Sequence, residues 1–151
     1  DYVSFIEKFT GKEPVAGDFV DLDGNVLGRH KGIIGYTVGQ RKGLGISLGI
    51  PAYVVKKDVA ANTVTLGSES DLYTQTLIAE DVNLISVAEI ETPMRITAKT
   101  RYRQTEQPAV VSALGNGEYL VEFDKPQRAV TSGQAVVFYD GDTVVGGGTI
   151  K

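Results

Sequence analysis

Short apolar segments separated by polar turns recur along the whole chain. Four of the turns contain glycine or asparagine, which tolerate a positive φ, and each turn lies between two segments rich in Val, Leu, Phe or Tyr. They are Asp23-Gly24, Ala61-Asn62, Gly115-Asn116-Gly117 and Asp140-Gly141. The pattern predicts four β-hairpins.

Helical periodicity is confined to short segments. Tyr2–Phe9 has apolar residues at every third position and predicts one short helix. Residues 32–40 are a second candidate, although three glycines weaken it, and residues 68–72 fit a single turn. We therefore expect a mainly β protein with only short helices.

A domain boundary is predicted near residues 73–76. Residues 1–74 form a small, glycine-rich central β domain that contains two of the hairpins and the short helical segments. Residues 75–151 contain strands with evenly spaced turns, which predicts a closed or nearly closed barrel of about six strands. No internal repeat or low-complexity segment interrupts either part.

The composition is that of a globular protein. Of 151 residues, 42% are hydrophobic and 23% are charged, and no apolar run approaches the ~18 residues of a membrane span. There is no basic and then apolar leader, so we expect no signal peptide and a cytoplasmic location. The missing initiator methionine fits a fragment of a longer protein. The chain has no cysteine, which excludes disulfides, thiolate metal ligands and a cysteine nucleophile from these residues.

The net charge of −4 hides an uneven distribution. Residues 24–57 contain no acidic residue but six Lys or Arg, and residues 95–105 contain no acidic residue but four. Such segregation creates local positive potential that attracts phosphates, which favours a nucleic-acid partner. The alternative is that both windows are ordinary solvated surfaces.

The second window alternates with the period of a strand. Arg95, Thr97, Lys99, Arg101 and Arg103 point to one face if residues 95–103 are extended, and Tyr102 points to the other. This predicts a ladder of cations suited to successive phosphates, with Tyr102 in the core. If the strand ends or bulges before it, Tyr102 is instead free to stack on a base.

Other candidate sites are weak. The loop Thr37–Gly45 lacks the spacing of a phosphate-binding or dinucleotide-binding loop, although Gln40, Arg41 and Lys42 supply donors among its glycines. Asp21–Asn25 resembles the start of a calcium loop but lacks the later glutamate, so a turn is expected. A single histidine, His30, makes a His-based metal site or a hydrolase triad improbable. We expect no metal site and no catalytic residue in this chain.

Several longer strings resemble one known family. They are His30–Gly32 (HKG), Tyr36–Gly45 (YTVGQRKGLG), Lys99–Gln104 (KTRYRQ), Ala129–Gln134 (AVTSGQ), Val137–Tyr139 (VFY) and Gly146–Ile150 (GGGTI). In order and spacing they are similar to the central and C-terminal domains of the tRNA-specific 2-thiouridylases. The resemblance covers nearly the whole chain.

The resemblance implies a division of labour within a larger enzyme. In that family an N-terminal domain uses ATP with magnesium to adenylate the wobble uridine at position 34 of tRNA, and a cysteine persulfide, supplied through a sulfur-donor protein, then delivers sulfur. This chain resembles the remainder, which grips the tRNA anticodon arm and ends in a β-barrel similar to domain 2 of elongation factor Tu. The fragment alone is expected to be inactive and to hold no cofactor.

The resemblance also implies which residues contact tRNA. Arg101, Tyr102 and Gln134 match tRNA-contacting positions of the family. Lys99 and Arg103 join them from the charge pattern, and Gln40, Arg41 and Lys42 are additional candidates. Two alternatives stay open: a non-enzymatic, translation-factor-like β-barrel that binds RNA, and a small-molecule enzyme built around Gly39–Gly45.

Overall fold

The computed structural model describes residues 15–151, and the chain divides into two compact units, residues 1–72 and residues 73–151. The helix predicted over Tyr2–Phe9 lies outside the described residues. Each unit is described by itself below. The observed elements are mainly β, as predicted.

The first unit is built on a four-stranded sheet of order β2-β1-β4-β3. Strands β1 (Gly17–Val20) and β2 (Val26–His30) form one hairpin, and β3 (Tyr53–Asp58) and β4 (Thr63–Gly67) form another. A parallel pairing of β1 with β4 joins the two hairpins. The buried residues Phe19, Val54, Val64 and Leu66 form the centre of this unit, as alternate residues of half-buried strands do.

Of the three helical segments predicted for this unit, the two that lie among the described residues are single turns. Residues 32–40 contain only the 3-10 turn η1 (Ile33–Gly35), so the longer helix predicted there is wrong. Gly32 has a φ of 136° and Gly39 a φ of 94°, and neither conformation continues a helix. The turn η2 (Glu69–Leu72) agrees with the prediction for residues 68–72.

His30 is part of the core rather than of a binding site. Its side chain is 1% exposed and lies edge-on to the rings of Phe19 and Tyr36. The backbone N–H of Gly32 donates to Nδ1 at 3.0 Å, so Nε2 carries the proton and donates to the carbonyl of Asn62 at 2.8 Å. Both ring nitrogens therefore have partners within the unit.

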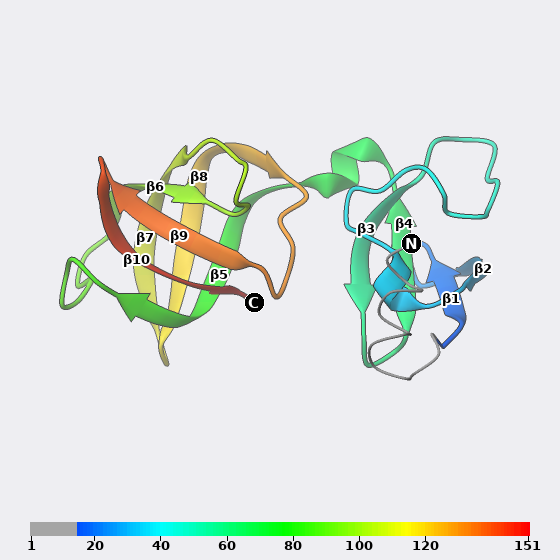
Figure 1. Cartoon of the computed structure of the whole chain (residues 1–151), viewed down its shortest axis with the longest axis horizontal. Helices are drawn as coiled ribbons and strands as arrows, with labels where there is room; N and C mark the ends of the chain where they lie inside the picture. The colour runs from blue at the N-terminus through cyan, green and yellow to red at the C-terminus, as the bar shows by residue number, and fades with distance from the viewer. Residues whose placement is uncertain (1–14) are drawn as a thin grey trace. The chain divides into compact units, whose positions relative to one another are not determined.

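The second unit is a closed antiparallel barrel of order β10-β5-β8-β7-β6-β9 (Figure 1). Its six strands are β5 (Tyr73–Leu84), β6 (Met94–Lys99), β7 (Gln107–Gly115), β8 (Glu118–Arg128), β9 (Ala135–Asp140) and β10 (Thr143–Ile150). Closure removes the exposed edges that an open sheet would leave. The barrel interior is filled by alternate residues of all six strands, among them Val111, Val121, Val136 and Phe138.

The four predicted hairpin turns are confirmed. Asn62 and Asn116 adopt positive φ values of 53° and 55°, and Gly24 and Gly141 adopt 85° and 60°. In the first turn, Asp21 accepts hydrogen bonds from the backbone of Asp23 and from Asn25, and these bonds lower the pKa of the Asp21 carboxyl. The segment is therefore a turn, as expected.

The glycine string of β10 lies against neighbouring backbone. A Cβ on Gly147 would stand 2.7 Å from the carbonyl oxygen of Val136, and one on Gly148 would stand 2.6 Å from that of Glu80.

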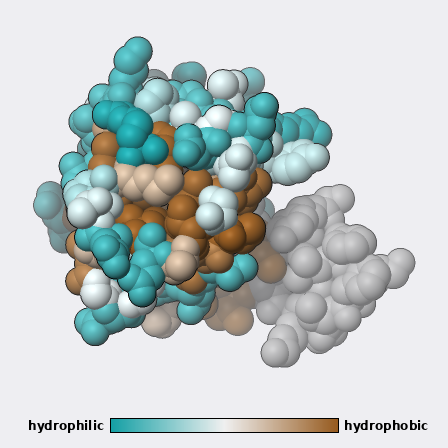
Figure 2. Space-filling view, turned by 90° about the vertical axis from the view of Figure 1, so that its left-hand side faces the viewer, coloured by the Kyte–Doolittle hydropathy of each residue, from teal (hydrophilic) through white to brown (hydrophobic). Residues whose placement is uncertain are grey.

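The surface of the barrel exposes apolar side chains, which gather on the face seen in Figure 2. Ile85, Leu114 and Val144 are exposed apolar residues of this unit.

Candidate nucleic-acid interface

The cationic strand predicted over residues 95–103 is shorter than expected. Strand β6 ends at Lys99, and the chain then turns, with the N–H of Gln104 donating to the carbonyl of Arg101 at 3.1 Å. Arg101 and Arg103 therefore lie on a turn and not on the strand. The prediction of one continuous ladder is wrong because the extended backbone stops at Thr100, which is buried.

The turn exposes Tyr102. The side chain is 94% exposed, so the interpretation of Tyr102 as a core residue is wrong and the alternative, that the strand ends before it, holds. Arg101 and Arg103 on either side are also exposed. An exposed phenol ring with an arginine on either side in the sequence is suited to stacking on an unpaired base while the cations meet phosphates.

The cations of β6 itself are already engaged. Arg95 forms an ion pair with Asp124, with Nη1 and Oδ1 2.7 Å apart. The ammonium of Lys99 lies 5.9 Å from the centre of the Tyr139 ring, within cation–π range. Between them the Thr97 hydroxyl donates to the Glu106 carboxylate at 2.6 Å, so an acid from outside the acid-free window also faces this strand.

Arg101 connects the turn to the loop that carries Gln134. One terminal N–H of its guanidinium donates to the carbonyl of Ala129 at 2.7 Å, and the Thr131 hydroxyl donates to the same oxygen. Ala129 has a φ of 58°, a conformation that is uncommon for residues with a Cβ. Gln134 is exposed, while its backbone bonds to Thr131 and Ile150 hold it in place. The fold thus brings Arg101 beside Ala129, five residues before Gln134.

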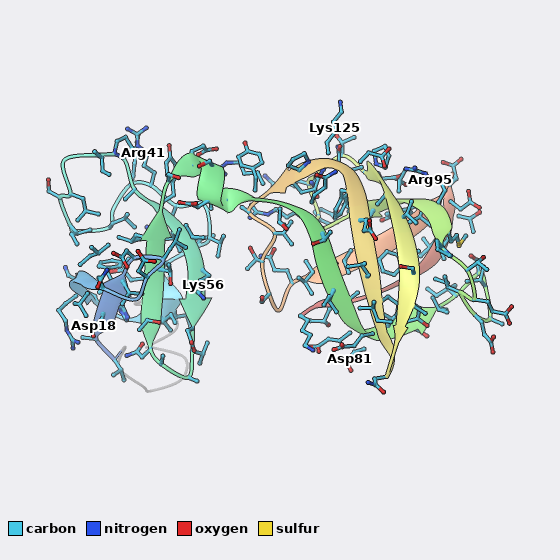
Figure 3. The ribbon with its side chains drawn as sticks, turned by 180° about the vertical axis from the view of Figure 1, so that it is seen from behind. Asp18, Arg41, Lys56, Asp81, Arg95 and Lys125 are labelled. Atoms are coloured by element: carbon cyan, nitrogen blue, oxygen red, sulfur yellow. The ribbon has the colours of Figure 1, made fainter. Side chains whose placement is uncertain are left out.

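The candidates in the first unit differ in role. The side chain of Gln40 accepts from the N–H of Thr37 and donates to the carbonyl of Lys42, so it stabilises its own loop. Arg41 and Lys42 are exposed, and Arg41 projects outward from the loop (Figure 3). A shallow groove of about 390 Å³ runs beside Arg41 and is otherwise lined by residues 44–52 except for Gly45.

Two further cations of the first acid-free window have intramolecular partners. Arg29 pairs with Asp18 at 2.7 Å. The ammonium of Lys57 donates to the carbonyl of Tyr36 at 2.8 Å, and its partial burial lowers the pKa of Lys57. Counting charges along the sequence therefore overstates how many cations are available to a ligand.

Potential metal ligands do not cluster in the part of the chain that the structure describes. Within residues 15–151, no three His, Asp or Glu side chains gather so that they could hold a metal ion. The same residues contain no helix long and apolar enough to cross a membrane. What the described chain presents is an aromatic and cationic surface on the barrel and a cationic loop on the first unit.

One buried residue of the barrel, next to the exposed turn, was not predicted from the sequence. Gln127 of β8 is buried and bonds to Gln104 below the exposed turn. Alternation gives no clear signal for this, because Lys125 has the same parity as Val121 and Phe123 and is exposed, and the pairing of β8 with β5 shifts register before Gln127.

Comparison with protein families defines the two units. Residues 3–68 match the family model described as the tRNA methyl transferase PRC-barrel domain, and residues 74–150 match the aminomethyltransferase β-barrel domain. The chain is therefore composed of a PRC-barrel domain followed by an aminomethyltransferase-type β-barrel.

Curated relatives carry both domains together. Proteins named tRNA-specific 2-thiouridylase MnmA are 58% identical in Acetivibrio thermocellus, 53% in Lachnoclostridium phytofermentans and 48% in Clostridioides difficile. The matches cover 99–100% of this chain but only 42% of each relative. The chain belongs to the tRNA-specific 2-thiouridylase family, which confirms the resemblance seen in its motifs, and it spans about two fifths of the length of these relatives.

Proposed function

We propose that this chain is the tRNA-binding portion of a tRNA-specific 2-thiouridylase, a sulfurtransferase that thiolates the wobble uridine at position 34. Membership of the family and the names of the relatives support the enzyme class. The part of the relatives that this chain does not match would carry adenylation by ATP with magnesium and persulfide transfer from a sulfur-donor protein. The enzyme would work in the cytoplasm.

The residues of this chain do not fit the chemical step. The sequence contains no cysteine and no G-x-x-x-x-G-K-[ST] loop, so it offers neither a persulfide carrier nor that kind of phosphate cradle. Its contribution would be to bind and orient the tRNA anticodon arm. Orientation alone is a large part of catalysis when the target is one base of a large substrate.

A single observation carries the binding role: Tyr102 is 94% exposed between two exposed arginines. A ring that is so exposed contributes little to the barrel core, whereas stacking on a base is worth ~1–3 kcal/mol. Gln134 lies on the adjoining loop, and Lys99 lies at the end of the strand that leads into the turn. Gln40, Arg41 and Lys42 are proposed as a second set of contacts, of which Arg41 and Lys42 have exposed charges.

The test compares two exposed arginines of the barrel. Binding of the chain to an RNA hairpin with the sequence of a tRNA anticodon arm is measured by fluorescence anisotropy at several salt concentrations. Arg103→Ala should weaken binding and reduce the salt slope by about 0.7–0.9, because one phosphate contact and its counterion release are lost. Arg95→Ala is the matched control, since Asp124 already neutralises this arginine.

Equal effects of the two substitutions would contradict the placement of the RNA on the turn. Adding ATP to the same chain tests the alternative of a small-molecule enzyme. A nucleotide-binding enzyme built around Gly39–Gly45 would bind ATP, whereas a tRNA-binding fragment would not. Saturable ATP binding by titration calorimetry would therefore contradict the proposed function.

A further inference from the structure

A partly buried network of hydrogen bonds adjoins the exposed turn. The side-chain oxygen of Gln104 accepts from both the N–H and the hydroxyl of Thr100, at 3.0 and 2.8 Å. The amide nitrogen of Gln104 donates to the side-chain oxygen of Gln127 at 3.2 Å. The amide nitrogen of Gln127 in turn donates to the carbonyl of Lys125 at 2.9 Å. This hydrogen-bond network therefore links Thr100, the first residue after β6, to the backbone of β8.

This network spans two strands that are not neighbours. β7 lies between β6 and β8 in the barrel, so no backbone ladder connects β6 or the turn after it to β8. Thr100 is 3% exposed and Gln127 is 6% exposed, which makes each of these bonds costly to lose. The two side-chain amides supply the connection that the sheet does not.

Packing alone does not explain the two glutamines. A cavity of about 130 Å³ adjoins Gln127 and is lined by Gln107, Pro108, Asp124 and Lys125 in addition to Gln127 itself. A side chain with free space on one side is held in one rotamer by its hydrogen bonds rather than by close contact. The residues on the outside of the turn also lack packing, because Arg101, Tyr102 and Arg103 are all exposed.

We infer that Gln104 and Gln127 are positioning residues, which hold the turn so that Tyr102 is presented to an RNA base in a fixed orientation. The inference rests on the proposed function and deepens it. A stacking contact with a preformed turn avoids the ordering cost that a mobile loop would incur on binding. The outer side of the turn is fixed in a similar way by the bond from Arg101 to the Ala129 carbonyl.

The experiment is a double-mutant cycle with Tyr102. Gln127→Met keeps the side-chain volume and removes both hydrogen bonds, and Tyr102→Ala removes the ring. Affinity for the anticodon-arm hairpin and thermal unfolding are measured for the wild type, both single variants and the double variant. We expect Gln127→Met to weaken binding by roughly 3- to 10-fold when Tyr102 is present and to have almost no effect when it is absent.

The outcomes separate the inference from the function on which it rests. If Gln127→Met weakens binding equally with and without Tyr102, or has no effect in either background, the positioning role is wrong while Tyr102 keeps its own role. If Tyr102→Ala leaves affinity unchanged, the proposed contact fails and the positioning role fails with it. A change in unfolding temperature alone does not support the inference, because any buried glutamine contributes to stability.

A second variant covers the case in which Gln127→Met does not fold. Gln104→Glu keeps the oxygens that accept from Thr100 and removes the amide donor to Gln127, so the turn stays closed but loses its link to β8. Backbone ¹⁵N relaxation should then show increased fast motion at residues 101–103 and unchanged motion in β7. Unchanged order in the turn together with unchanged RNA affinity would overturn the inference.

Discussion

The environment of Tyr102 determines whether its ring can contribute to stability or to binding. An aromatic ring that is 94% exposed adds little to the barrel core, whereas a buried one of the same size stabilises a domain by several kcal/mol. Tyr102 lies on the turn after β6, between Arg101 and Arg103 in the sequence. Its exposure leaves the ring free to contact a partner of the chain.

The first residue-scale prediction follows from this exposure. Tyr102→Ala should change the free energy of unfolding by no more than about 0.5 kcal/mol, because a surface substitution removes few contacts. It should weaken binding of the anticodon-arm hairpin by ~1–3 kcal/mol through lost stacking, while Tyr102→Phe should retain most of the affinity. Urea denaturation and fluorescence anisotropy measure the two effects. A loss of stability of several kcal/mol would contradict the exposed position.

The residue pattern could predict the alternatives at Tyr102 but not choose between them. Period-2 alternation places Tyr102 inside if the strand continues and frees it if the strand stops at Lys99. Directly after the strand, the side chain of Gln104 accepts a hydrogen bond from the N–H of Thr100, so this N–H is used within the turn. A bond between side chain and backbone of this kind depends on rotamers that alternation does not encode.

Arg101 was expected to be a free cation, and the structure assigns it a second role. Its guanidinium donates to the carbonyl of Ala129, which has a positive φ. Four of the five N–H donors of an arginine stay available when one is used internally. Arg101 therefore combines a structural bond with a charge that can meet a phosphate, whereas Arg103 is the cleaner probe of charge alone.

At the scale of elements, the local features were predictable and the long-range pairings were not. Each hairpin joins two strands through a turn that contains a residue type tolerant of positive φ, such as Asn116 between β7 and β8. The parallel pairing of β1 with β4 and the pairing of β6 with β9 join segments about 40 residues apart. Nothing in a short window of sequence specifies those partners.

The glycines of β10 give the prediction at this scale. Gly147→Ala would place a Cβ 2.7 Å from the carbonyl oxygen of Val136, and backbone on a paired strand cannot move aside cheaply. The overpacking cost of ~1–3 kcal/mol exceeds the ~0.4–1 kcal/mol that a Gly→Ala change gains from the unfolded chain. We therefore expect a net loss of stability, measured as a lower urea midpoint at unchanged slope.

The control for this substitution lies on the same strand. Thr143 is exposed at the start of β10, so Thr143→Ala should change the urea midpoint little. If Gly147→Ala is as stable as Thr143→Ala, the close approach of β10 to β9 is not what requires a glycine at position 147.

At the scale of the whole molecule, the two units have separate hydrophobic cores. The main core cluster of the barrel is drawn from residues between Leu77 and Ile150, and its strands pair only with one another. The core of the first unit is centred on Phe19, Val54 and Val64. A unit with its own closed sheet and its own core has what independent folding requires.

We therefore predict that residues 73–151 fold alone. The fragment begins at Tyr73, the first residue of β5, and so retains every strand of the barrel. Its thermal unfolding followed by circular dichroism should be cooperative, and its ¹H–¹⁵N spectrum should be dispersed and should overlay the barrel signals of the longer chain. A collapsed spectrum would mean that the barrel needs the first unit in order to fold.

The matched control lacks the first unit and, in addition, one strand of the barrel. A fragment of residues 94–151 lacks β5, which pairs with both β8 and β10, so its loss opens the barrel and leaves two unpaired edges. Open edges and an uncovered core favour aggregation over folding. We expect this shorter fragment to be insoluble or unfolded under conditions in which residues 73–151 are folded. If both fragments fold equally well, closure of the barrel by β5 is not what stabilises the second unit.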